Sequence, residues 1–193
     1  MAGIDRKLNL VIPVDNSDGS VTYVHSTPIS REVFERYFKI IARTFAEIYS
    51  GGYTVYAGPR VAALLLKSTA MDLGVWDGPT GVERGLMAEI RRLTNVVLPA
   101  PQGGWVTMPF VEAIKAGQIN DDDVAEVDNA LAFFTVACAM HKKSDLMGIL
   151  SGASKLWGGS TTSFNCTEFA ASLTTSTEVG NTGETQTTSS LPS

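Results

Sequence analysis

Cys138 and His141 are the two residues whose types and spacing come closest to a catalytic pair. Three positions apart in a predicted helix, their side chains can share one face, and a thiolate beside an imidazole is a known nucleophile. The sequence supplies no third group to orient such a pair, and two ligands do not complete a zinc site. We therefore interpret Cys138 as a small core residue and His141 as a cation at the C-terminal end of its helix.

Asp121, Asp122 and Asp123 form the other group with possible chemistry, because hard cations such as Mg²⁺ prefer carboxylate ligands. Three successive helix positions point in different directions around the axis, so they do not converge on one ion. Acids in the first turn of a helix and bases in its last turn, here residues 141–143, both complement the helix dipole. We therefore predict a structural role for these acids, and we expect no metal site, no cofactor and no enzymatic activity.

Three large aromatic residues lie beside glycines of predicted loops: Trp76, Trp105 and Trp157. Because a tryptophan side chain is usually buried, we expect these residues to pack over a helical core. The alternative is that one of them is an exposed anchor in a protein interface.

The elements that must position these residues are mostly helices. Apolar residues alternate over 8–14 and 21–25, on either side of a turn-forming run, which predicts a β-hairpin. Ser30 is a suitable N-cap for a helix that ends at Gly51, and Pro59 is predicted to open a second helix because proline is favoured in the first turn. A loop is expected over 98–108, and further helices over 80–93, 112–116, 121–143 with Asn120 as N-cap, and 145–156.

Composition and charge restrict the classes of partner. The chain has 193 residues and a net charge of −5, and its basic residues alternate with acids, which argues against nucleic acid as a partner. The apolar run 130–140 is too short to span a bilayer, so we expect no membrane insertion. The two cysteines stand in unlike contexts, which favours a reduced, cytosolic setting over a disulfide framework.

The sequence changes in character after Trp157. Residues 158–193 are rich in Ser and Thr and poor in apolar side chains, so we expect a flexible polar tail after a folded domain over 1–157. Phe164, Phe169 and Leu173 are apolar residues within this tail, and we predict that they bind a partner. The predicted fold is mainly α (α+β), with an N-terminal β-hairpin, a bundle of about five helices and the flexible C-terminal tail.

Several stretches of the sequence resemble one family of viral proteins. The segments Lys7–Val14, Tyr23–Ser30, Phe34–Phe38 and Asn165–Ala170 are similar to tail assembly chaperones of long-tailed (siphovirus-like) bacteriophages. The resemblance implies a non-enzymatic protein that coats the tape measure protein and helps recruit tail tube protein. It also implies a protein of the host cytoplasm that is absent from the mature virion.

A second hypothesis is a structural virion protein, such as a head–tail connector or minor tail component. In either case the partners are proteins, and a homo-oligomer is possible. For a chaperone, amphipathic helices would cover apolar surface of the tape measure protein by helix-in-groove contacts, and the helices over 31–49 and 121–143 are the expected contributors.

Overall fold

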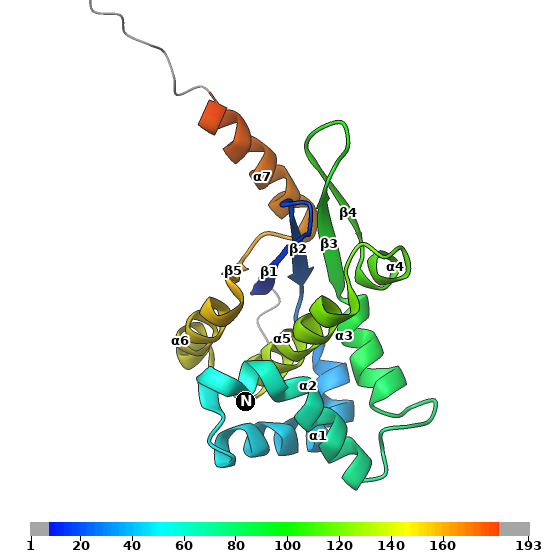
Figure 1. Ribbon diagram of the computed structural model, residues 1–193. Coiled ribbons are helices and arrows are strands. Elements are labelled where there is room, and N and C mark those ends of the chain that lie inside the picture. Colours follow the sequence, from blue (N-terminus) through cyan, green and yellow to red (C-terminus); the bar gives the residue numbers. More distant parts are fainter. Residues whose placement is uncertain (1–7, 182–193) are drawn as a thin grey trace, which may run out of the picture.

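The computed structural model describes residues 8–181, together with their side chains except those of 54–56, 143 and 174–181. Its centre is a five-stranded sheet with the order β4-β3-β2-β1-β5, in which every neighbouring pair is antiparallel (Figure 1). The strands are β1 (Asn9–Asp15), β2 (Val21–Ser26), β3 (Thr94–Pro99), β4 (Trp105–Pro109) and β5 (Ser160–Thr162).

Helices make up most of the remaining described chain. They are α1 (Arg31–Ser50), α2 (Thr54–Asp72), the π-helical segment η1 (Glu83–Met87), α3 (Ala88–Arg92), α4 (Phe110–Lys115), α5 (Asp121–Met140), α6 (Lys143–Ser154), the 3-10 turn η2 (Lys155–Trp157) and α7 (Cys166–Asn181).

The predicted hairpin is confirmed, but the predicted fold class is wrong. β1 and β2 pair as expected, and the structure then extends them into a mixed α/β fold instead of a hairpin followed by a helical bundle. The segment Thr94–Pro99, which follows the helix predicted over 80–93, is the strand β3, and the predicted loop over 98–108 contains most of β4. The apolar run Val96–Leu98 is buried because a central strand is covered on both faces, and such a run has no strand periodicity to read.

The prediction of a flexible tail is also wrong for residues 158–181, the part of the tail that the structure describes. Residues 160–162 form β5, which pairs with β1 from Asn9↔Thr162 to Val11↔Ser160. Residues 166–181 form α7, while 182–193 lie outside the described residues. The Ser/Thr-rich composition gave no sign of this strand, because β5 is stabilised by pairing with β1, which lies far away in the sequence.

Two N-caps are confirmed and one helix start is wrong. The Ser30 side chain accepts a hydrogen bond from the Val33 N–H, and the Asn120 side chain accepts one from the Asp123 N–H. Pro59 does not open α2 but lies inside it. Nearby, the Asn129 side chain of α5 accepts a hydrogen bond from the Ala63 N–H of α2 at 2.9 Å. A side chain of the neighbouring helix thus provides the acceptor for a backbone N–H of α2.

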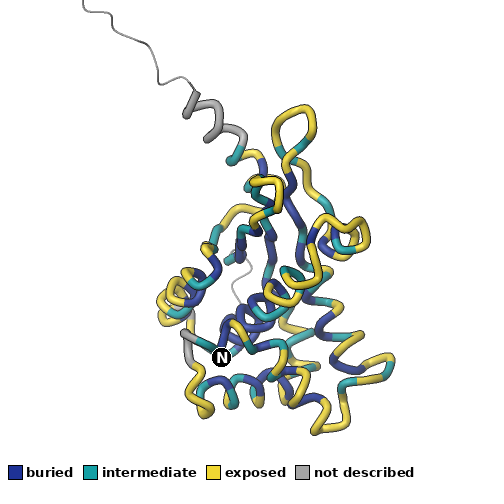
Figure 2. Tube along the Cα trace, viewed as in Figure 1, coloured by how far each residue is buried: buried dark blue, intermediate teal, exposed yellow. Residues whose placement is uncertain are grey.

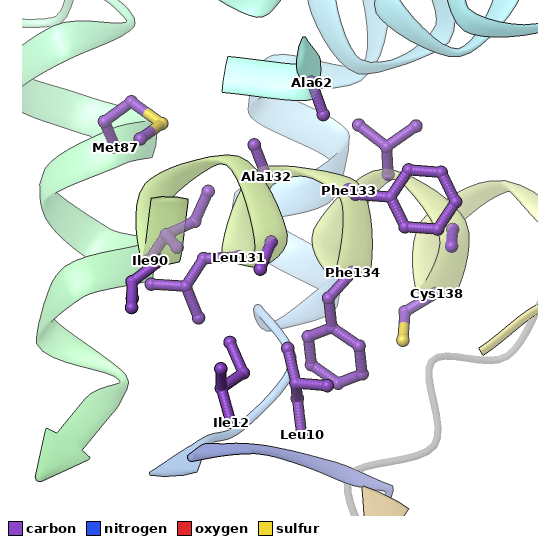
Figure 3. Packing of buried hydrophobic residues seen from close by; sticks show 14 of the residues in the cluster. Leu10, Ile12, Ala62, Met87, Ile90, Leu131, Ala132, Phe133, Phe134 and Cys138 are labelled. Atoms are coloured by element: carbon purple, nitrogen blue, oxygen red, sulfur yellow. The ribbon is translucent and has the colours of Figure 1, made fainter. Parts of the chain in front are cut away.

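The core lies between one face of the sheet and the helices. Leu131 and Phe134 of α5 point toward Leu10 and Ile12 of β1 (Figure 3). Helices α1 and α2 contact α5 from its other side, so most of the C-terminal half of α5 is buried all round (Figure 2). This enclosure explains why α5 has apolar side chains on every face in that half.

The opposite face of the sheet is partly covered by the C-terminal segment. Cross-strand pairing places Val11, Tyr23, His25 and Val97 on this second face. Helix α7 contacts β3 and β4, and the ring of Phe169 meets Tyr23 edge to face with 5.5 Å between centroids. The segment that looked like a free tail therefore contributes to burial of the sheet.

Candidate protein-binding groove

Helix α1 is distorted at Tyr37, and the distortion is tied to a distant segment. Tyr37 has the non-helical dihedrals φ −107° and ψ 15°, and its hydroxyl donates to the carbonyl oxygen of Thr80 at 3.3 Å. A Cβ atom on Gly85 would lie only 1.6 Å from the Tyr37 hydroxyl oxygen. Glycine at position 85 is therefore what allows the tyrosine to reach across from α1.

Gly85 belongs to η1, an irregular segment in its own right. The Met87 N–H donates to the carbonyl oxygen of Val82 at 2.9 Å, which is the wider spacing of a π-helix. Such turns are rare and occur frequently at functional sites. The bend of α1, the loop after α2 and the π-helical turn thus meet at one place.

A groove of about 580 Å³ lies at this place, between α1 and the loop over 73–82. Its apolar walls include Phe38, Leu73 and Val75, which are 49%, 42% and 43% exposed, and its base includes the buried Ile40 and Val82. Apolar side chains that gather in one exposed hollow are typical of surfaces that bind another protein.

Charged side chains form the rim of the groove along α1. Glu35 pairs with Arg31 at 2.7 Å and Arg36 pairs with Glu32 at 3.0 Å, both one helical turn apart. Lys39 also lines the groove, and it makes no ion pair within residues 8–181. An apolar centre with a charged rim is the usual anatomy of a protein interface.

The predicted partner-binding residues lie elsewhere, near the second face of the sheet. Phe169 packs on Tyr23 and His25, Leu173 is half-buried, and the Phe164 side chain is 48% exposed. The carbonyl oxygen of Phe164 accepts hydrogen bonds from Asn9 Nδ2 at 2.8 Å and His25 Nε2 at 2.9 Å. The structure thus brings Phe164 and Phe169 to the protein's own sheet, and their binding of a partner stays a prediction.

Cys138 and His141 do not form a site. Cys138 is buried in the core, as predicted. His141 caps α5 and its Nε2 lies 2.7 Å from the Tyr49 hydroxyl, where partial burial lowers the pKa of the imidazole. This burial opposes the predicted role of His141 as a cation, whereas the nearby Asp145 carboxylate favours it.

The predicted acidic turn and tryptophans are found as follows. Asp121, Asp122 and Asp123 are in the first turn of α5, as predicted. Trp157 is buried against Phe133, and Trp76 packs against the core, which confirms the packing role for these two. Within residues 8–181, no group of three or more His, Cys, Asp or Glu side chains is placed to hold a metal ion.

The groove itself was not found from the sequence. Phe38 falls among the apolar positions of a regular helix, so nothing in its spacing marks it as exposed. Leu73 and Val75 flank Gly74, and apolar residues beside a helix-ending glycine commonly pack on the last turn of their own helix, so the sequence gives no signal that these two are exposed.

Comparison with protein-family models, curated proteins and solved structures found no match. Function must therefore be argued from the geometry of the site. In the part of the chain that the structure describes, no helix combines the length and apolar character needed to cross a bilayer.

Proposed function

We propose that this protein is a phage tail assembly chaperone that holds an apolar helical segment of the tape measure protein in the groove between α1 and the loop over 73–82. The observation that carries the proposal is the exposure of Phe38, Leu73 and Val75 in one hollow. The resemblance of the sequence to tail assembly chaperones supplies the identity of the partner.

The physical basis is protection of apolar surface. A long helical protein that awaits assembly exposes apolar side chains, and covering them with an apolar groove removes that surface from water. The charged rim on α1 would keep the complex soluble and would disfavour association of two copies of this protein through their grooves. In this role the protein acts in the host cytoplasm, assists recruitment of tail tube protein, and does not remain in the virion.

Co-expression with the tape measure protein of the same phage tests the proposal. We expect the tape measure protein to become soluble and to co-purify, and Val75→Asp to reduce the recovered complex about tenfold, a loss of roughly 1.4 kcal/mol. Val111→Asp is the matched control, because Val111 on α4 is 39% exposed and lies outside the groove. Equal recovery with both variants would contradict a role for the groove, and no gain in solubility with the unaltered protein would contradict the chaperone function.

Mass spectrometry of purified particles tests the second hypothesis, a head–tail connector or minor tail component. A chaperone should be absent from mature virions. A fixed copy number in the particle would replace the chaperone proposal by the structural one.

A further inference from the structure

The carbonyl oxygen of Phe164 is a point at which the C-terminal segment is held to the sheet. It accepts hydrogen bonds from Asn9 Nδ2 at 2.8 Å and from His25 Nε2 at 2.9 Å. The ring of Phe169 lies 6.0 Å from the His25 ring, measured between centroids, and His25 is fully buried. We call residues 160–173, which comprise β5 and the first turns of α7, the strap.

The strap is attached to the fold more lightly than the core helices are. β5 is only three residues long and pairs with β1, and α7 contacts β3 and β4 (Figure 1). Two glycines separate the strap from η2: Gly158 has a φ of +62°, and a Cβ atom on Gly159 would lie 2.6 Å from the carbonyl oxygen of Val11. The strap can leave the sheet by rotation at these glycines while α1, α2 and α5 stay packed on the other face.

The surroundings of His25 fit a neutral imidazole and not a charged one. Because a carbonyl oxygen only accepts, Nε2 carries the proton of the neutral ring, and Nδ1 has no hydrogen-bond partner among the described residues. Protonation at Nδ1 would create a buried donor and a buried positive charge without an acceptor. Burial accordingly lowers the pKa of His25, although the Phe164 carbonyl and the backbone of His25 itself oppose this effect.

The elements around His25 supply no buried counter-charge. Among the described side chains of the five strands and α7, the carboxylates are Asp15 and Glu168, both exposed, and there is no Lys or Arg. The other titratable groups there are the Tyr23 phenol and the Cys166 thiol, and burial raises the pKa of the thiol to about 11. His25 is therefore the group in this region that changes charge between pH 7.5 and pH 5.5.

We propose that the strap is an acid-sensitive latch, which is released from the second face of the sheet when His25 is protonated. Release gives Nδ1 and the new charge access to water, and it withdraws Phe169 from Tyr23, while the core on the other face stays folded. An exposed histidine has the ordinary pKa of about 6.5, so the population with an open strap rises by up to about tenfold between pH 7.5 and pH 5.5.

Hydrogen exchange of the unaltered full-length protein, followed by mass spectrometry of peptic peptides, measures the opening. Exchange rates at the two pH values are divided by the chemical rates of an unfolded chain, so that only the opening equilibrium is compared. We expect residues 160–173 to open more often than residues 127–139 of α5, with a weaker dependence on urea, and about tenfold more often at pH 5.5 than at pH 7.5. Equal protection and equal urea dependence of the two segments would overturn the proposal, because the strap would then open only with the whole protein.

The two histidines of the chain provide matched variants. His25→Gln keeps a side-chain N–H that can donate to Phe164 but takes up no proton, so residues 160–173 should lose their pH dependence. His141→Gln removes the imidazole beside Tyr49, which lies between α5 and α1, and should leave the pH dependence of the strap in place. An unchanged pH dependence in His25→Gln would contradict the latch. So would the absence of any change in the unaltered protein, a result that requires no variant to fold.

Discussion

Gly85 shows how one missing side chain shapes the candidate groove. The Tyr37 hydroxyl occupies the place where a Cβ atom would be, and it fixes α1 to the loop through Thr80. The bend in α1 and the width of the groove are therefore linked to a residue on a different element.

We predict that Gly85→Ala destabilises the protein by about 1–3 kcal/mol, since the added methyl group forces Tyr37 out of its position. Urea unfolding measures the loss. Tyr37→Phe removes the oxygen in closest contact, so the double variant Tyr37→Phe with Gly85→Ala should recover part of the stability. If Gly85→Ala is as stable as the unaltered protein, the close approach of Tyr37 is contradicted.

His25 is the residue whose protonation is expected to matter most for stability. It is fully buried, its Nε2 donates to the carbonyl oxygen of Phe164, and its Nδ1 has no partner in the described structure. Burial lowers the pKa of His25 in the folded protein, although the hydrogen bond to Phe164 opposes that effect. Between the lowered pKa of the folded state and the ordinary histidine pKa, His25 is therefore neutral in the folded protein but protonated in the unfolded chain.

The resulting prediction is a loss of stability as the pH falls. Because the ordinary histidine pKa is about 6.5, the contribution of His25 is complete above that pH and declines below it, down to the lowered pKa of the folded state. The urea concentration at the midpoint of unfolding should decrease as the pH is lowered from 7.5 to 5.5. His25→Gln should flatten this dependence, and His141→Gln should flatten a further part, because burial also lowers the pKa of His141. A slope unchanged by His25→Gln would contradict the assignment.

At the scale of elements, a charged pair joins the short helix α3 to the central helix α5. Arg91 Nε donates to one carboxylate oxygen of Asp128 at 3.0 Å, and Arg91 Nη2 donates to the other. The Asp128 side chain is only 13% exposed, so the pair is well shielded from water on that side. The hydrogen bonds to Asp128 raise the pKa of Arg91, which keeps the guanidinium charged.

We predict that Asp128→Asn lowers the free energy of unfolding by about 1–3 kcal/mol, because a hydrogen bond between two charges is replaced by a weaker one. Glu89→Gln is the control, and it removes a carboxylate from α3, the helix that carries Arg91. It breaks the pair with Arg92, whose side chain is 67% exposed, and should cost less than about 1 kcal/mol. If Asp128→Asn and Glu89→Gln lower the free energy of unfolding equally in denaturant, the partial burial of the Arg91–Asp128 pair adds nothing to its stabilising effect.

The elements differ in how far the sequence alone could predict them. Helices with side-chain caps were predictable, since Ser30 and Asn120 act through hydrogen bonds within a few residues. The hairpin was predictable for the same reason, because its turn is local. β3 was not, because Val96 and Val97 are buried on both faces and show no alternation. The groove was not predictable either, because it forms between α1 and the loop over 73–82, which lies more than thirty positions further along the sequence.

At the scale of the whole molecule, the segment from β5 to α7 completes the sheet on its second face. Asn9 and His25 both donate to the Phe164 carbonyl oxygen, and Phe169 covers Tyr23. Without this segment two buried donors lose their acceptor, and apolar surface of the sheet becomes exposed.

We predict that a chain ending at Gly159 is less stable by several kcal/mol and aggregates, as judged by thermal unfolding and size-exclusion chromatography. A chain ending at Asn181 is the control, because it keeps every contact described here. If the chain ending at Gly159 unfolds at the same temperature as the control, the segment contributes nothing to the fold, and its apolar residues are then free to serve a partner alone.

The place of β1 between β2 and β5 has a consequence for synthesis of the chain. The hydrogen bond between Asn9 and Phe164 joins residues 155 positions apart, so one edge of β1 stays unpaired until residues 160–164 have left the ribosome. An open strand edge is a template for pairing with other chains. During translation β1 is therefore an exposed edge until β5 emerges, and β5, a strand of three residues, then replaces it as the edge of the sheet.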